Sequence, residues 1–237
     1  YFFFFFAIRF LERYRSDIAL VVFSSALVGR RNTLSSIFFI LKNTGFRHTV
    51  FKISTYGIFK LTRILSQVFP RILCGCSTLL WVKRNNLKFI ITDDVNSALC
   101  TNAIKAANPE LIVSVSMNQV IKKEILNLPT NRSINVHCAP LPQYGGMSPY
   151  IWGLANNENY SAATIHYMDE GLDTGDIIVQ EKVSVLAEDS AFCLFHRCCS
   201  AASELLLETV KKIQNGSVES YPQDLSKKSY FSWPTKQ

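Results

Sequence analysis

Apolar residues along this 237-residue chain gather in two patterns, short continuous runs and longer runs with helical periodicity. Continuous apolar runs that end in small or polar residues are typical of buried parallel strands. The runs are residues 17–25 (DIALVVFSS), 87–92 (LKFIIT), 111–116 (LIVSVS) and 133–137 (SINVH). Helical patterns at 95–110 and 122–129 separate the last three runs. This alternation predicts an α/β fold with a mostly parallel sheet flanked by helices.

The first third of the chain is predicted to be mainly helical. Residues 1–17 (YFFFFFAIRFLERYRSD) are expected to form an amphipathic helix buried on one face, with a membrane-surface anchor as the alternative. The apolar run is broken at Arg9 and is too short for a membrane span, which needs about 20 residues. Residues 34–43 and 56–69 are further helix candidates. In the segment 95–110, Asn96 is the expected N-cap and Pro109 ends the helix.

The last third has a different pattern. Residues 162–185 contain two alternating runs joined by a glycine-rich acidic loop, which predicts a hairpin added to the sheet. Residues 189–216 predict a long helix with an acidic start and a glycine stop, and the tail at 217–237 is expected to be extended and to pack across the domain. The length favours one domain over residues 1–237. Because the chain starts with Tyr1 and no strand precedes residue 17, we expect a fragment that lacks the first strand of its sheet.

Composition narrows the possible classes of protein. With 48% hydrophobic and 18% charged residues, the chain is not a disordered or linker sequence. The number of cysteines is odd, at seven, and they form no CxxC pair, which argues against a zinc site and favours a reduced cytoplasmic setting. The net charge of +7 would suit RNA, but the basic residues are scattered in pairs, as on solvated faces. There is also no GxGxxG or GKS/GKT phosphate loop, so a nucleotide- or RNA-binding module is only an alternative.

The candidate chemistry begins at the end of the run at 133–137. Ligands of open parallel sheets bind at the carboxyl ends of strands, and the i, i+2 spacing of Asn135 and His137 turns both side chains to one face. An amide can donate to a developing oxyanion, and an imidazole can carry a proton near neutral pH. A carboxylate to orient the ring could come from the acidic loop. Its four candidates are Asp169, Glu170, Asp173 and Asp176. The spacing alone also suits a structural histidine.

Two long motifs add to this pattern. INVHCAPLPQYGGMSPYIWGL, followed by ATIHYMDEGLDTGDIIVQE, resembles the 10-formyltetrahydrofolate-dependent formyltransferases, with the strongest similarity over residues 109–180. These enzymes include methionyl-tRNA formyltransferase, glycinamide ribonucleotide formyltransferase, a deformylase and nucleotide-sugar N-formyltransferases. The resemblance implies their Rossmann-like fold and places the catalytic residues at Asn135, His137 and Asp173. It implies direct attack of an amine on the formyl carbon without a metal, in a cleft opened by the proline-rich turn.

The resemblance also implies a site for the formyl donor, 10-formyltetrahydrofolate. The pterin would bind to backbone groups after the run at 111–116 and to the acidic loop. These residues are Met117, Asn118, Gln119, Val120, Ile121, Met168, Asp169, Glu170 and Gly171, with the loop continuing to Asp173. An ordinary strand-to-helix turn is the alternative for 117–121. Gly145 stands where members often carry Arg, so an anion contact from that side chain is not expected.

The acceptor amine is less sharply defined. Pro149 and Trp152 resemble the tRNA and sugar branches, whereas His166 resembles the sugar, purine and deformylase branches. The sequence ends about 60 residues after Asp173, which argues against the C-terminal domain of the tRNA enzymes unless the sequence is also truncated at this end. Its tail SYFSWPT resembles that of small formyltransferases that act on amino sugars or are unassigned. The sequence therefore favours a small-molecule amine, such as a nucleotide-linked amino sugar, handled in the cytoplasm. Transfer to tRNA and hydrolysis of the formyl folate are the alternatives.

Overall fold

The computed structural model describes residues 2–24 and 78–233, with isolated positions between 35 and 54. The chain forms two compact units, residues 1–100 with 235–237 and residues 101–234. The assignment of a single domain over residues 1–237 stays a prediction. The helix expected at 34–43 lies largely outside the described residues, and the one expected at 56–69 lies wholly outside them.

The first unit contains a two-stranded parallel sheet. Strand β1 (Val21–Ser24) pairs with β2 (Phe89–Thr92), and Val21 lies opposite Phe89. The predicted N-terminal helix is confirmed as α1 (Phe2–Arg13), which packs against α4 (Thr78–Arg84). Leu11 is the buried residue on its last turns. Within the described ranges, no helix has the length and apolar character needed to cross a membrane.

The helix after β2 starts one residue later than expected. Helix α5 (Ala98–Ala107) is capped by Ser97, whose Oγ accepts a hydrogen bond from the N–H of Cys100 at 3.3 Å. Asn96, the predicted cap, instead donates its backbone N–H to the Asp94 carboxylate in the preceding turn. The Asn96 prediction was therefore wrong, because the helix begins at Ala98 and this places Ser97, not Asn96, at the capping position.

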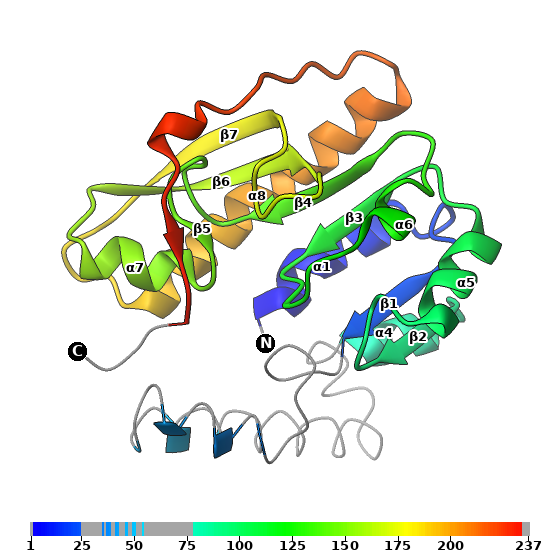
Figure 1. Ribbon diagram of the computed structural model, residues 1–237, viewed down its shortest axis with the longest axis horizontal. Helices are drawn as coiled ribbons and strands as arrows, with labels where there is room; N and C mark the ends of the chain where they lie inside the picture. The colour runs from blue at the N-terminus through cyan, green and yellow to red at the C-terminus, as the bar shows by residue number, and fades with distance from the viewer. Residues whose placement is uncertain are drawn as a thin grey trace. The chain divides into compact units, whose positions relative to one another are not determined.

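The second unit contains a four-stranded sheet in the order β3-β4-β6-β7 (Figure 1). Strands β3 (Ile112–Val115) and β4 (Ser133–His137) are parallel and are joined through the short helix α6 (Lys123–Leu126). Strands β6 (Tyr160–Tyr167) and β7 (Ile177–Ser184) form the predicted hairpin, and β6 pairs antiparallel with β4. The β3–β4 pair is therefore parallel, whereas the β4–β6 and β6–β7 pairs are antiparallel.

Helix α8 (Ala191–Gln214) packs on β6 and β7 of this sheet (Figure 1). Ser190 caps its first turn by accepting from the N–H of Cys193, and Gly216 follows its end with a φ of 67°. Its fully buried Leu194 and Leu206 share the core with Ile134 and Ile165 of the sheet. Helix α7 (Pro149–Ala155), which also contacts α8, was not anticipated from the sequence.

The C-terminal tail is extended and packs across the second unit, as predicted. Tyr221 forms an antiparallel bridge with Ile177 at the start of β7. After the short 3₁₀ helix η2 (Leu225–Lys227), strand β8 (Tyr230–Phe231) pairs in parallel with β5 (Gly145–Gly146) (Figure 1, red strand). The tail therefore adds backbone pairing at two separate places.

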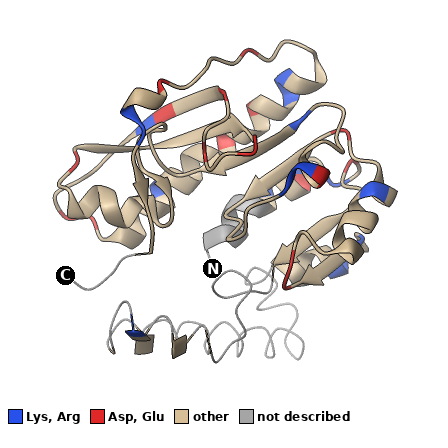
Figure 2. Cartoon of the chain, viewed as in Figure 1, with Lys and Arg blue, Asp and Glu red and all other residues tan. Residues whose placement is uncertain are grey.

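The basic residues lie on several separate elements rather than together on one (Figure 2). Lys123 is on α6, Lys211 and Lys212 end α8, and Lys227 is in η2. This distribution is that of solvated faces, and no single described element presents a basic stripe to a polyanion.

Candidate active site

Asn135 and His137 lie at the carboxyl-terminal end of β4, an inner strand of the four-stranded sheet. Their side chains share a face of the sheet because successive residues of a strand alternate between faces. The antiparallel neighbour β6 sets Asn135 opposite His166 and His137 opposite Thr164. His137 is 7% exposed and His166 is 2% exposed, so both rings depend on protein partners for their hydrogen bonds.

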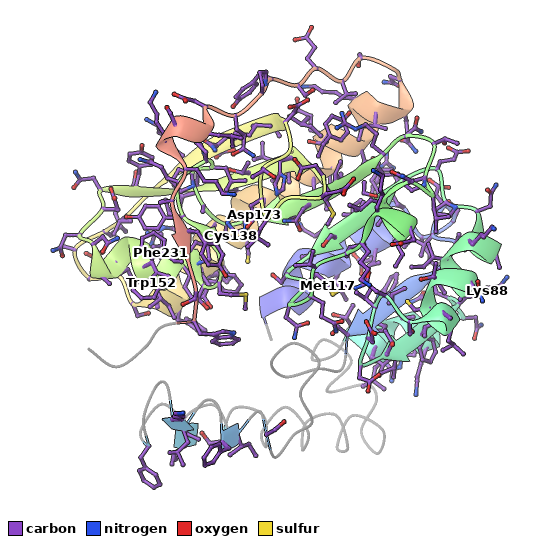
Figure 3. The ribbon with its side chains drawn as sticks, in the orientation of Figure 1. Lys88, Met117, Cys138, Trp152, Asp173 and Phe231 are labelled. Atoms are coloured by element: carbon purple, nitrogen blue, oxygen red, sulfur yellow. The ribbon has the colours of Figure 1, made fainter. Side chains whose placement is uncertain are left out.

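Asp173 reaches this face from the loop between β6 and β7 (Figure 3). Its Oδ2 accepts a hydrogen bond from the backbone N–H of Gly146 at 2.8 Å and lies 3.9 Å from Nδ1 of His137. Its Oδ1 lies 3.7 Å from Nε2 of His166. The structure thus brings together an amide, two imidazoles and a carboxylate from two segments that are distant in the sequence.

The partners of the two rings fix their tautomers. Nε2 of His137 lies 3.0 Å from the carbonyl oxygen of Tyr144, which can only accept, so this nitrogen carries the proton. Its Nδ1 then faces Asp173 at a distance too long for a hydrogen bond. Nδ1 of His166 donates to the Tyr167 carbonyl at 2.7 Å, which leaves Nε2 to accept an N–H of Asn135 at 3.2 Å.

The electrostatic setting keeps His166 neutral. Burial lowers the pKa of His166 below its usual value, and the neighbouring His137 lowers it further. The Asp173 carboxylate acts in the opposite direction but does not overcome burial. A neutral His166 with a bare Nε2 holds the Asn135 amide with its nitrogen toward the ring, so the orientation of Asn135 is set by its cross-strand neighbour.

The turn that follows β4 is held by several contacts of Tyr144. The ring of Tyr144 stacks on Phe231 with centroids 5.0 Å apart, and its hydroxyl donates to Glu158 at 2.6 Å. Its backbone N–H donates to Oγ of Ser229 at 2.9 Å. Burial raises the pKa of the Tyr144 hydroxyl, and the bond to Glu158 adds to this effect. These contacts fix the carbonyl that holds the ring of His137.

Gly145 directly adjoins the carboxylate of Asp173. A Cβ placed on Gly145 would lie 3.7 Å from Oδ2 of Asp173 and 3.4 Å from the carbonyl of Ser229, both ordinary contacts. A longer side chain at position 145 would therefore start beside the carboxylate. The glycine leaves this side of the site without a charged neighbour from that position.

The residues predicted to bind the formyl donor fall into two groups. Met168, Asp169, Glu170 and Gly171 line a cavity of about 500 Å³ together with Lys123 and Arg132. Lys123 pairs with Glu170 at 2.6 Å in this cavity. Met117, Asn118, Gln119, Val120 and Ile121 do not line it; they follow β3, where Met117 is labelled in Figure 3.

A family model described as formyl transferase matches residues 91–210, about half of the chain. The chain belongs to this formyl transferase family. The matched region contains Asn135, His137, His166 and Asp173, the residues whose side chains converge.

Relatives in the family include methionyl-tRNA formyltransferases. The one from Thermodesulfovibrio yellowstonii is 38% identical over 120 residues, which is 51% of this chain and 39% of the relative. The one from Alkaliphilus oremlandii is 38% identical over 135 residues, which is 57% of this chain and 44% of the relative. The chain thus aligns with less than half the length of these relatives.

Solved structures of the formyl transferase family share the fold. A sugar 3N-formyl transferase, solved in the presence of dTDP and 5-N-formyl-THF, is 28% identical with a TM-score of 0.56 over 66% of this chain and 53% of that chain. The N-formyltransferase from Helicobacter canadensis, in complex with folinic acid and dTDP-3-aminofucose, is 27% identical with a TM-score of 0.54 over 66% and 54%. These likenesses confirm the predicted formyltransferase fold.

His166 was not among the site residues predicted from the sequence. The available signal was the place of His166 in an alternating run, TIHYM, but this run does not indicate which residue His166 would face on the neighbouring strand.

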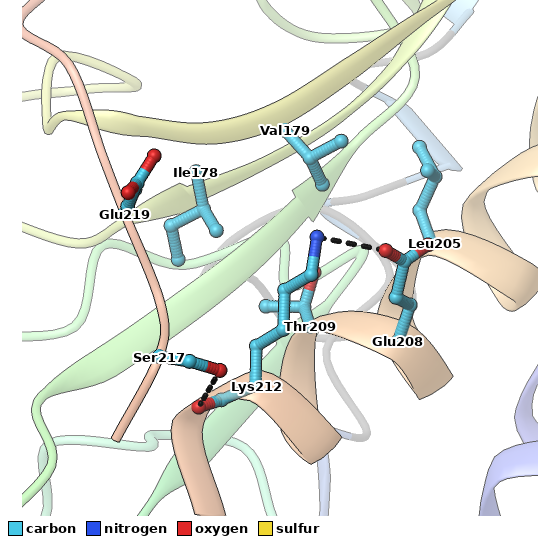
Figure 4. A pocket seen from close by; sticks show the side chains of 8 residues that line it. All are labelled: Ile178, Val179, Leu205, Glu208, Thr209, Lys212, Ser217 and Glu219. Carbon is cyan, nitrogen blue, oxygen red and sulfur yellow. Dashed lines mark hydrogen bonds and ion pairs between the residues drawn. The ribbon is translucent and has the colours of Figure 1, made fainter. Parts of the chain in front are cut away.

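A second, smaller cavity of about 150 Å³ contains none of the predicted site residues (Figure 4). It lies against β7 and α8, where Lys212 pairs with Glu208 at 2.7 Å.

Proposed function

We propose that this chain transfers a formyl group from 10-formyltetrahydrofolate to the primary amine of a small molecule. The observation that carries the proposal is the convergence of Asn135, His137 and Asp173 on one face of the sheet. Two solved relatives support it, because one contains 5-N-formyl-THF and the other folinic acid.

The transfer begins with attack of the amine nitrogen on the formyl carbon, which moves negative charge onto the formyl oxygen. One N–H of the Asn135 amide binds His166, and the amide carries a second N–H that can donate to this oxygen. The cross-strand bond holds the amide in position before the reaction, which is the condition for strong oxyanion stabilisation. One such donor lowers a barrier by about 3 kcal/mol.

The attacking amine must also lose a proton, and the leaving nitrogen of the folate must gain one. His137 and Asp173 are suited to hold it, since Nδ1 of His137 faces the Asp173 carboxylate at 3.9 Å. A proton taken up at Nδ1 would give an imidazolium next to a carboxylate, with Nε2 still bound to the Tyr144 carbonyl. The new carbon–nitrogen bond forms, the bond to the folate nitrogen breaks, and the proton passes from one nitrogen to the other.

The folate would use both segments assigned to it, 117–121 and 168–171. The cavity at 168–171 is also lined by Arg132, whose guanidinium suits a carboxylate of a folate, while Lys123 is paired with Glu170. Asp173 follows the second segment in the same loop, and Asn135 lies on β4, which pairs with β3, the strand that precedes the first segment. The free thiols of the described cysteines support the cytoplasm as the compartment.

For the acceptor we favour a nucleotide-linked amino sugar, because the two solved relatives contain dTDP or a dTDP-linked amino sugar. The matches to methionyl-tRNA formyltransferases make methionyl-tRNA the second candidate. Both acceptors present a primary amine, so the site described above would serve either one.

The test is to incubate the protein with 10-formyltetrahydrofolate and one acceptor at a time: no amine, dTDP-linked amino sugars, glycinamide ribonucleotide or methionyl-tRNA. Release of tetrahydrofolate and formylated amine are measured together. Formylation of a sugar amine supports the proposal, and formylation of the tRNA alone supports the second candidate. Release that is equal in every tube shows a hydrolase and refutes the transfer. His196→Ala, a histidine replacement on the exposed face of α8, is the matched control for His137→Ala.

A further inference from the structure

The backbone of Asp173 is held by a residue of the C-terminal tail. The side-chain amide of Gln223 donates to the carbonyl of Asp173 at 3.1 Å and to the carbonyl of Gly175 at 2.6 Å. An amide group has two N–H donors, so this one nitrogen binds both carbonyls. The two bonds close the loop on either side of Thr174.

The loop needs such a clamp because of its backbone conformation. Asp173 has a φ of 53°, in the left-handed region that costs a side-chain-bearing residue free energy and that the surroundings must hold. Two residues later, Gly175 packs so closely that any Cβ there would collide with the carbonyl of Tyr167. The loop therefore follows one path, and the Gln223 amide binds it at the two carbonyls that define that path.

Gln223 is itself fixed by the tail on which it lies. Tyr221, two residues before it, exchanges two backbone hydrogen bonds of 2.9 Å with Ile177 at the start of β7. At the other end, β8 pairs with β5, which contains Gly146, the donor to the Asp173 carboxylate. The tail thus holds Asp173 in two ways. Gln223 binds its carbonyl directly, and β8 pairs with β5, whose Gly146 binds its carboxylate.

We propose that Gln223 is a positioning residue that fixes the Asp173 carboxylate between His137 and His166. It acts through the loop backbone and touches neither ring among the described contacts. Its effect on turnover rests on the proposed function, whereas its effect on the geometry of the carboxylate does not.

The first readout is independent of activity. Gln223→Met removes both N–H donors while nearly keeping the length of the side chain. The pKa of the His166 ring is then measured by NMR titration of isotope-labelled protein. Because the Asp173 charge raises the pKa of His166, moving the carboxylate away should lower that pKa further. Asp173→Asn should shift it in the same direction. Gln180→Met is the matched control, since Gln180 also donates twice, to the Leu141 carbonyl and Oγ1 of Thr164, and neither of these described hydrogen bonds involves the Asp173 loop.

The second readout is kinetic. In Gln223→Met, kcat should fall by about tenfold to a hundredfold with little change in the KM for the amine, as expected when a reacting group is misplaced. The proposal is overturned if Gln223→Met folds and its His166 has the wild-type pKa, while Asp173→Asn changes that pKa. If Gln223→Met does not fold, Gln223→Asn keeps both donors on a shorter side chain, and the same comparison is decisive. A wild type without transfer activity would refute the proposed function and leave the NMR comparison intact.

Discussion

Replacing Gly146 with alanine should detach the C-terminal strand from the turn that follows β4. Gly146 has a φ of 100°, a conformation that L residues rarely adopt. A Cβ at this position would collide with the carbonyl oxygen of Phe231 and lie 2.5 Å from Cε2 of the Tyr230 ring. Both obstacles belong to β8, so the strand must move away to make room for the methyl group.

The structure sets the size of this effect. The positive φ costs an alanine about 1 to 2 kcal/mol. Moving β8 also weakens the hydrogen bonds from Met147 N–H to Phe231 at 2.8 Å and from Gly145 N–H to Ser229 at 3.0 Å. Each contributes about 1 kcal/mol. The free energy of unfolding should therefore fall by roughly 2 to 4 kcal/mol, which lowers the melting temperature of a chain of this length by roughly 5 to 15 °C.

The neighbouring glycine provides the control. Gly145 does not have a positive φ, and its added Cβ would make only ordinary contacts, so Gly145→Ala should change stability by less than about 1 kcal/mol. Thermal unfolding gives the two stabilities, and hydrogen exchange at the amides of Gly145 and Met147 reports on the β5–β8 pairing itself. Equal stability and equal protection in the two variants would refute this account of how the tail is held.

Three further predictions concern the site and its surroundings. His137→Ala and Asp173→Asn should each reduce formyl transfer by about a hundredfold or more with unchanged circular dichroism, and wild-type rates in both would remove them from the mechanism. Because the pKa of His166 is lowered in the folded protein, the unfolded chain binds more protons below about pH 6.5, and the free energy of unfolding should fall as the pH is lowered through that range. Urea unfolding at several pH values should show a smaller fall in His166→Gln than in the wild type. An identical dependence of the free energy of unfolding on pH in the two proteins would contradict a lowered pKa for His166. Iodoacetamide near neutral pH should modify the exposed Cys193 and spare Cys198, because burial raises the pKa of Cys198 to about 12. Peptide mass mapping identifies the modified cysteine, and modification of Cys198 before Cys193 would contradict the burial of Cys198.

The sequence alone determined the elements whose signals are local. The apolar run at 133–137 became β4 with the predicted bounds, and the alternating runs on either side of the acidic loop became β6 and β7. The side-chain period of two residues in a strand was enough to put Asn135 and His137 on one face. Two motifs in the right order were enough to indicate the family, because they contain the candidate catalytic residues at a characteristic separation along the chain.

Which side chains meet in the site depends on strand pairing and loop path, which the sequence patterns do not contain. His166 lies beside Asn135 because β4 and β6 pair in one antiparallel register, and a shift of one residue would turn it to the other face. Asp173 binds Gly146 rather than His137, and Gln223 binds the Asp173 loop from a tail that follows it by 50 residues. Such contacts depend on strand register and on the path of loops between distant segments. Local periodicity and capping preferences contain neither, so these contacts could not be read from the order of the residues.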